Sequence, residues 1–124
     1  MQHFDLSALM AGLAGRPWLE FLRVPSLSVG VYHLKAGRED PQRPHTEDEV
    51  YYVVAGRARF KAGQEERAVG PGTVLFVERL AEHRFFAIAE DLTALVFFAP
   101  AEGPLRGETS ASSCAGWRPP PALA

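Results

Sequence analysis

Apolar residues recur along most of this chain in short runs that alternate with polar residues. A period of two is typical of β-strands that bury one face, and turns containing Gly, Pro or Asp separate the runs. The pattern predicts about eight or nine short strands. They include residues 18–24, 27–35, 50–54, 57–62, 65–69, 73–77, 83–88 and 92–98. No gap between them is long enough for a crossover helix, so we expect an all-β sandwich or barrel.

One short helix is predicted near the N-terminus. Residues 5–14 carry leucines and a methionine at helical spacing, and Asp5 is a suitable N-cap. After residue 99 the composition shifts to Ala, Gly, Ser and Pro, with Trp117 as the only large apolar anchor. We therefore expect a helical segment, a barrel, and an extended or disordered tail, at residues 1–16, 17–99 and 100–124.

Composition and charge exclude several classes of protein. A chain of 124 residues suits one domain, and a net charge of -2 without a basic stripe argues against nucleic acid as a partner. The only cysteine is Cys114, so an intramolecular disulfide is impossible. No apolar run approaches the roughly 20 residues of a membrane helix, and no signal peptide is visible. We expect a cytoplasmic protein with no membrane partner.

The residues with the most suggestive chemistry lie at the starts of two predicted strands. His45, Glu47 and Glu49 alternate just before one strand, Arg43 shares their alternation, and His83 begins another strand. Alternate side chains in a strand share a face, so we expect the fold to bring the two strand ends together. Two imidazoles and a carboxylate suit Zn, Fe, Mn, Co or Ni, and without a metal the same groups can act as acid and base. Taken singly, such residues are also typical of a solvated turn.

His33 and Cys114 are weaker candidates. His33 lies within the strand at 27–35, where it is better explained as a hydrogen-bonded core or interface histidine than as a ligand. Cys114 lies in a serine-rich stretch with no histidine nearby, which argues against a catalytic thiol.

The loop before residue 50 matches the spacing of a known motif. Gly37 is followed by five residues, then Arg43, one residue and His45; Glu49 comes after three more residues and Gly56 after a further six. The first motif of the cupin family has the order glycine, five residues, His-x-His, three or four residues, glutamate, six residues, glycine. Every spacing fits, and the one departure is Arg43, which stands in place of the first histidine.

A second stretch follows the other cupin motif less closely. That motif has the order glycine, five residues, Pro-x-Gly, two residues, histidine, three residues, asparagine. Gly72 and His83 keep their places, and three other motif residues are replaced by Glu78, Leu80 and Ala87. Over residues 27–99 the chain thus resembles the cupin superfamily, which implies a double-stranded β-helix, or jelly-roll barrel.

The resemblance also implies a metal site. His45, Glu49 and His83 match three of the four usual cupin ligands, so we expect a divalent ion of Zn, Mn, Fe, Ni or Co. Arg43 cannot be the fourth ligand, because its guanidinium stays protonated and offers no lone pair.

Three arrangements of this site stay open. The ion keeps three protein ligands and completes its shell with water, or Gln42 or Glu47 takes the vacant place. Alternatively the site is metal-free, and Arg43 pairs with Glu49 and meets an anionic ligand.

The resemblance favours a metal-dependent enzyme that acts on a small anionic or polar molecule, with the reaction unassigned. Arg43 and Tyr52 are expected to contact the substrate, with Tyr51 as the alternative to Tyr52. The competing hypotheses are a non-catalytic module that binds or senses a small molecule, with or without metal, and a structural protein with a vestigial pocket. Single-domain cupins often form homodimers, and exposed apolar strands and the Trp18 region are consistent with one here.

Overall fold

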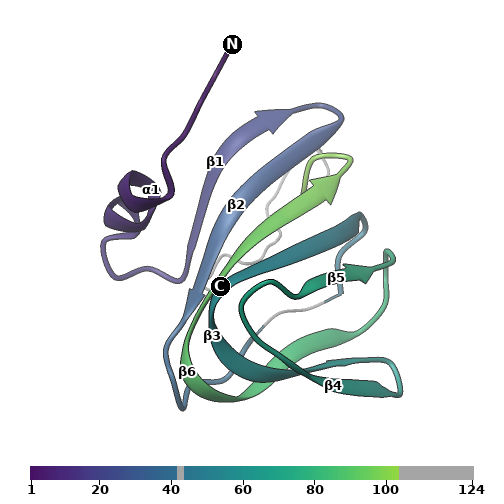
Figure 1. Cartoon of the computed structure of the whole chain (residues 1–124). Coiled ribbons are helices and arrows are strands. Elements are labelled where there is room, and N and C mark those ends of the chain that lie inside the picture. The colour runs from purple at the N-terminus through teal and green to yellow at the C-terminus, as the bar shows by residue number, and fades with distance from the viewer. Residues whose placement is uncertain (42–43, 104–124) are drawn as a thin grey trace.

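The computed structural model describes residues 1–41 and 44–103. This part of the chain contains one helix, α1 (Leu6–Leu13), followed by six strands (Figure 1). The strands are β1 (Trp18–Val24), β2 (Leu27–Leu34), β3 (Asp48–Ala62), β4 (Glu65–Val69), β5 (Val74–Val77) and β6 (His83–Ala99). Within the described residues, no helix has the length and apolar character needed to cross a membrane.

The strands form a single antiparallel sheet that curls on itself. Their order is β1-β2-β6-β3-β4, and β5 pairs with the other part of β3. The two long strands, β3 and β6, bend so that one part of each lies in an upper layer with β1 and β2 and the other part lies in a lower layer (Figure 1). The predicted all-β barrel with a short N-terminal helix is therefore confirmed.

The number of strands was predicted wrongly, because two expected turns are bends within β3 and β6. Residues 50–54 and 57–62 belong to β3, and the ladder between β3 and β6 shifts register three times between Val53 and Arg59. Gly56 lies at this bend with φ +95°, and a Cβ there would stand 2.2 Å from the carbonyl oxygen of Asp91. A glycine in such a place lets two backbones approach closely and need not reverse the chain.

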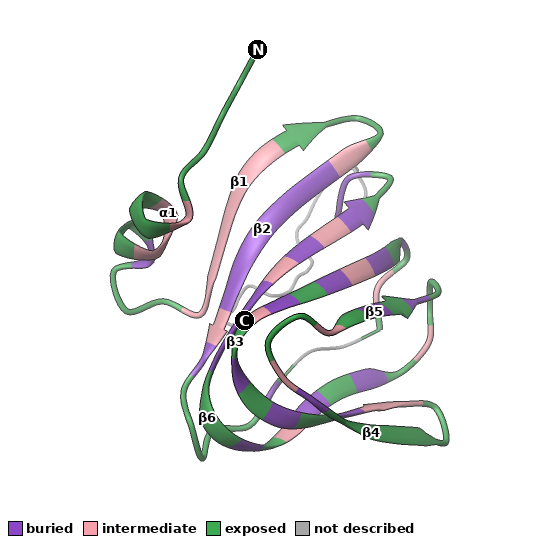
Figure 2. Cartoon of the chain, in the orientation of Figure 1, coloured by how far each residue is buried: buried purple, intermediate pink, exposed green. Residues whose placement is uncertain are grey.

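Alternation along the strands separates a buried inner face from an outer face (Figure 2). On β3, Tyr51 and Val53 are fully buried, whereas Tyr52 between them is 41% exposed. Only half of β5 is buried, because Val74 and Phe76 point outward. The core is formed by inner-face residues of five strands, among them Tyr32, Leu34, Tyr51, Val53, Phe60, Val69, Leu75, Val77, Phe85, Leu92, Val96 and Phe98.

Trp18 packs against this core. It is partly buried and packs edge-on against Tyr32 and Phe98. Gly30 makes room for it, since a Cβ at that position would lie 2.2 Å from the indole ring. The contribution of the Trp18 region to a dimer surface stays a prediction.

The first residues after β6 turn back onto the barrel. Ala101 donates its backbone N–H to the carbonyl of Pro25, and Glu102 donates its backbone N–H to Ser28 Oγ at 2.7 Å. Both Ala101 and Glu102 are buried, so the extended tail expected from residue 100 does not begin there. Cys114 and Trp117 lie outside the described residues.

Candidate metal centre

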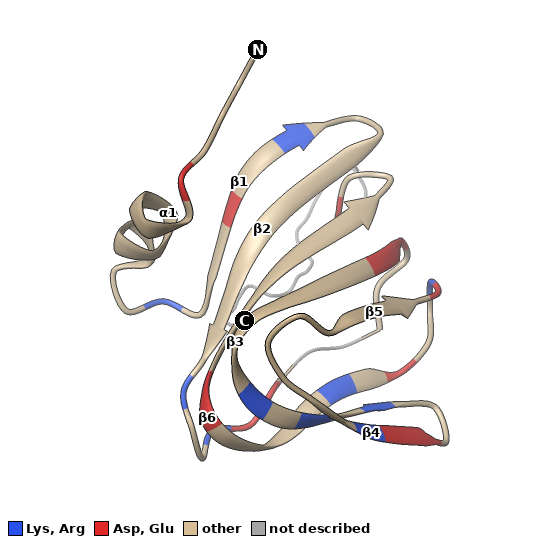
Figure 3. Ribbon diagram, in the orientation of Figure 1, with Lys and Arg blue, Asp and Glu red and all other residues tan. Residues whose placement is uncertain are grey.

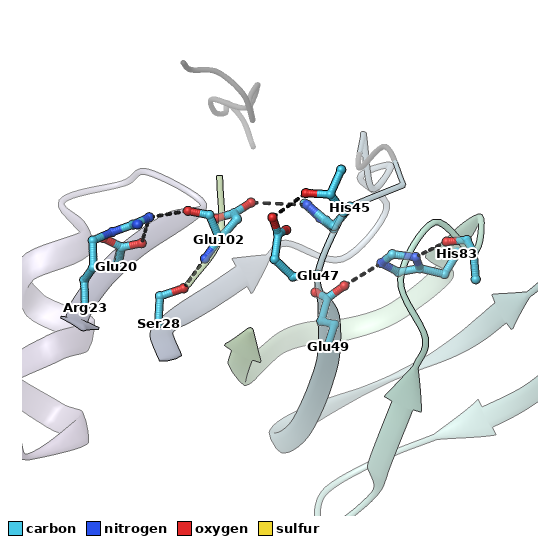
Figure 4. A network of polar contacts seen from close by, with 10 residues as sticks. Glu20, Arg23, Ser28, His45, Glu47, Glu49, His83 and Glu102 are labelled. Carbon is cyan, nitrogen blue, oxygen red and sulfur yellow. Dashed lines mark hydrogen bonds and ion pairs between the residues drawn. The ribbon is translucent and has the colours of Figure 1, made fainter. Parts of the chain in front are cut away.

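The curvature of β3 and β6 creates the candidate site. Glu49, near the start of β3, pairs with Phe98, whereas His83, the first residue of β6, pairs with Ala62. The two residues thus lie at opposite ends of the same ladder, and the bends bring them back together. With His45 they form a group whose ligand atoms all lie within 4.8 Å of one another (Figure 4).

Two backbone contacts hold the ligand-bearing segments together. The N–H of Leu80 donates to the carbonyl of His45 at 2.6 Å, and the N–H of Arg79 donates to Asp48 Oδ1 at 2.9 Å. Leu80 adopts φ +68°. It stands where the second cupin motif has glycine, the residue that tolerates this left-handed conformation best. The loop before His83 therefore holds a left-handed residue at this position without the motif's glycine.

A buried carboxylate fixes the preceding loop. Asp40 accepts a hydrogen bond from the Tyr32 hydroxyl at 2.5 Å and another from the N–H of Phe85 at 2.9 Å. Burial, together with the charge of Asp40, raises the pKa of Tyr32 well above its usual value, so the hydroxyl stays protonated and able to donate. Sequence reasoning placed Asp40 in a polar loop and missed this role, because nothing local marks an aspartate that bonds across the barrel.

His83 and Glu49 form a tight, fully buried pair. Their closest atoms, Nε2 and Oε1, are 2.9 Å apart, and each side chain is 1% exposed. The Nδ1 of His83 lies 2.8 Å from the carbonyl oxygen of Ala81, to which it can only donate, so Nε2 is the nitrogen that faces the site. Burial by itself would lower the pKa of His83, but the Glu49 carboxylate raises it to about 9. Burial would likewise raise the pKa of Glu49, yet the neighbouring histidines hold it below its usual value.

The donor atoms fit a divalent cation. Both carboxylate oxygens of Glu49 and Nε2 of His83 are buried and have no hydrogen-bond partner among the described residues. Nε2 and Oε1 are 2.9 Å apart, a separation that suits either an ion pair or two ligands of one ion. Buried polar atoms without partners cost free energy, and an ion would satisfy all three. One carboxylate with two imidazoles is a set that zinc and other first-row metals accept.

His45 is oriented by a residue that sequence reasoning missed. Its Nδ1 lies 3.3 Å from Glu102 Oε2, and both side chains are nearly buried. Burial lowers the pKa of His45, and the positive charge of His83 acts in the same direction, while the Glu49 carboxylate opposes them. A neutral imidazole is the form that binds a metal. Glu102 had been assigned to the tail, and no motif marks it.

The other predicted site residues are placed differently. Gln42 and Arg43 lie outside the described residues. Glu47 is buried and accepts a hydrogen bond from the Thr46 hydroxyl, and it is not a member of the ligand group. Tyr52 was expected to face the pocket, but it lies on the outer face, because strand alternation turns Tyr51 inward instead.

The inward tyrosine and the remaining candidate histidine are both well packed. The ring of Tyr51 lies 6.0 Å from that of His83, centre to centre. His33 faces outward, with Nδ1 3.0 Å from the hydroxyl of Thr93. His33 is therefore a hydrogen-bonded structural residue, as expected.

A cavity of about 290 Å³ opens beside His83. Its lining consists of Pro44, Lys61, Gly63, Glu82, His83 and Arg84. Lys61 and Arg84 are direct cross-strand partners, although like charges in that relation repel. Lys61 forms a distant ion pair with Glu66, at 3.9 Å, and Arg84 lies over the ring of Phe86. Lys61 and Arg84 can attract an anion to this cavity, although strand alternation turns them to the face of the ladder opposite the His83 side chain.

Comparisons with known proteins agree with this architecture. A protein of Streptomyces coelicolor, SCO3923, is 45% identical over 104 residues, which is 82% of this chain and 99% of that protein. The crystal structure of a double-stranded β-helix protein from Klebsiella pneumoniae superposes with a TM-score of 0.68 at 17% identity, covering 81% of this chain and 90% of that one.

An enzyme is also among the similar structures. The DMSP lyase DddQ from Ruegeria pomeroyi is 31% identical, with a TM-score of 0.59, over 70% of this chain. The match covers 42% of the lyase chain, so this chain spans less than half of that enzyme. The sequence family described as a cupin domain matches residues 30–99, more than half of the chain. The chain belongs to the cupin family.

Proposed function

We propose that this protein is a metal-dependent cupin enzyme that acts on a small anionic molecule. The observation that carries the proposal is the buried group of His45, Glu49 and His83, in which three donor atoms have no hydrogen-bond partner among the described residues. A divalent cation bound there would supply Lewis-acid or oxygen-binding chemistry.

The protein's own residues prepare this site in three ways. Glu49 provides one negative charge in a buried setting, where it offsets part of the charge of a cation. The Ala81 carbonyl orients His83, and Glu102 contacts His45 from the side of Nδ1. Such outer contacts fix ring orientation and raise ligand basicity. Three protein ligands leave coordination positions for water and substrate.

The cavity next to His83 supports the choice of an anionic substrate. Lys61 and Arg84 line it, and its volume of about 290 Å³ suits a small molecule. Arg43 precedes the lining residue Pro44, and we retain Arg43 as a substrate contact. The likeness to a DMSP lyase supports an enzyme, but the lyase's substrate is not transferred to a chain that covers less than half of it.

The alternative function is a metal-free module that binds or senses a small molecule. The close pair of His83 and Glu49 favours it, because a proton on Nε2 would neutralise the carboxylate without any ion. In that case Lys61 and Arg84 would still attract an anionic ligand to the cavity.

Metal content per chain separates these functions. We expect natively purified protein, reconstituted with Zn, Mn, Fe, Co or Ni, to hold close to one equivalent of at least one metal by plasma mass spectrometry. His83→Ala and His45→Ala should hold less than about a tenth of that, because loss of one of three ligands lowers affinity steeply. His33→Ala is the matched control, since His33 lies on the outer face with Thr93 as its partner.

Two results would contradict the enzyme proposal. One is wild-type protein that stays below a tenth of an equivalent with every metal, and the other is His33→Ala losing as much metal as His83→Ala. A metal-free protein whose melting temperature still rises with small carboxylates, with and without chelator, would establish the binding module instead.

We also propose a homodimer in a reducing, cytoplasmic setting. Tyr52, Val74 and Phe76 form an apolar group on the outer face, which we call the β3–β5 patch. Their exposed fractions are 41%, 63% and 66%. Tyr52 and Val74 are cross-strand partners, and β5 carries no charged residue (Figure 3). A second copy of the chain is the simplest partner for such a surface.

A further inference from the structure

Glu102 is held in place by two strands of the sheet at once. Its backbone N–H donates to Ser28 Oγ on β2, and its backbone carbonyl accepts from the guanidinium of Arg23 on β1. Arg23 is itself fixed by two hydrogen bonds of 2.9 Å to Glu20. Figure 4 shows the resulting chain of polar contacts, which runs from β1 through Glu102 to His45. A carboxylate anchored in this way has little freedom to leave the imidazole.

The side chain of Glu102 lies beside the ligand group without joining it. Oε2 is 3.3 Å from His45 Nδ1, and the two side chains are 10% and 11% exposed. The ligand atoms that lie within 4.8 Å of one another come from His45, Glu49 and His83 alone among the described residues. A carboxylate on one ring nitrogen favours the tautomer with a proton there, so the other nitrogen becomes the one for coordination.

We propose that Glu102 is a positioning residue that keeps the Nδ1 of His45 protonated and commits its Nε2 to the metal. This inference rests on the proposed metal site. Glu102 lies beyond residues 30–99, which match the cupin domain, so the residue is supplied by the segment after the last strand. Glu102 orients the ring of His45 from Nδ1, as the Ala81 carbonyl orients the ring of His83. The two histidines are thus oriented by separate segments, His83 by the loop before β6 and His45 by the segment that follows β6.

The test compares Glu102→Ala and Glu102→Gln with wild type in the full-length protein. In metal-free protein at fixed pH, imidazole ¹⁵N chemical shifts should show His45 protonated at Nδ1 in wild type and a tautomer mixture in Glu102→Ala. The signals of His83 serve as the internal reference and should not move. Affinity for Co²⁺, measured by competition with a chelator, should fall about ten- to a hundredfold in Glu102→Ala. Glu102→Gln keeps an acceptor oxygen and should lose less than tenfold.

Thr93→Val controls for a general loss of stability. It removes a buried hydroxyl that contacts His33 on the outer face, at little change in volume. This variant should be destabilised yet bind Co²⁺ as wild type does. The proposal is overturned if Glu102→Ala keeps both the wild-type tautomer of His45 and the wild-type affinity, or if Thr93→Val loses as much affinity. If wild type binds no metal, the proposed function fails, while the tautomer comparison still decides whether Glu102 positions His45.

Discussion

At the scale of single residues, a proton and a metal ion compete for the same place in the candidate site, between His83 and Glu49. Nε2 of His83 and Oε1 of Glu49 are 2.9 Å apart inside the barrel, too close for a bare lone pair and a carboxylate to be stable together. The Glu49 carboxylate raises the pKa of His83 to about 9, which favours a proton on Nε2 in metal-free protein. In metal-bound protein the cation would take the place of that proton.

This competition predicts opposite pH dependences for stability and for metal binding. The folded-state pKa of His83, about 9, exceeds its ordinary value of 6.5. Its contribution to the stability of metal-free protein is thus complete below pH 6.5 and is lost as pH rises through 9. The loss is on the order of 3 kcal/mol. Over the same range metal affinity should rise, by roughly tenfold per pH unit, as the competing proton leaves.

Urea unfolding of chelator-treated protein between pH 6.5 and 9.5 measures the first effect, and metal titration at the same pH values measures the second. His83→Gln is the control and should flatten both profiles in this range. Metal-free stability that is flat or increases toward pH 9 in wild type would contradict the assigned pair.

At the scale of elements, the loop before β6 carries strain that the motif glycine would avoid. Leu80 has φ +68° and is 62% exposed, so its side chain gains little from packing in return. Ala87, where the motif has asparagine, also has a positive φ, of 49°. Two of the three missing motif residues, the glycine and the asparagine, are thus ones that tolerate a left-handed backbone, and Leu80 and Ala87 adopt it in their place.

Leu80→Gly should therefore stabilise the protein. A leucine with a left-handed backbone costs about 1–2 kcal/mol of folding free energy. Glycine removes this cost but loses more chain entropy on folding, so the net stabilisation is roughly 0.5–1 kcal/mol. Arg79→Gly, next to it at an ordinary φ, should destabilise by a similar amount. Chemical denaturation of both variants decides the matter, and a Leu80→Gly protein less stable than wild type would show that Leu80 is not strained.

The sequence was informative about elements and much less so about what connects them. Period-two alternation located the strands, but it could not show that Gly56 bends one strand instead of joining two, since a glycine serves both purposes. Alternation also left Tyr51 and Tyr52 undecided, because facing direction depends on register across β3 and β6. Spacing found His45, Glu49 and His83. Asp40 and Glu102 were not identified from the sequence, since their partners lie across the barrel and no local pattern marks such contacts.

At the scale of the whole molecule, the two faces of the curled sheet have different roles. The inner face carries the core and the ligand group, and the outer face exposes the β3–β5 patch of Tyr52, Val74 and Phe76. Exposed aromatic and branched side chains on neighbouring strands are typical of a surface covered in an oligomer.

Phe76→Ser should shift the proposed dimer toward monomer by at least tenfold in dissociation constant, because Phe76 is 66% exposed in the single chain and would be buried in the dimer. Sedimentation velocity over a range of concentrations measures this. Leu80→Ser is the control, since Leu80 is similarly exposed but lies in the loop after β5 and not on a strand of the patch. A wild-type protein that remains monomeric at every concentration would rule out the dimer.

The central claim concerns the space between His45, Glu49 and His83, and crystallography of the reconstituted protein tests it most directly. Diffraction data collected just above and just below the absorption edge of the added metal should give one anomalous peak per chain. That peak should lie within about 2.0–2.2 Å of a nitrogen of each histidine and an oxygen of Glu49. An anomalous map with no peak among these three residues, or with its only peak elsewhere on the chain, would contradict the account.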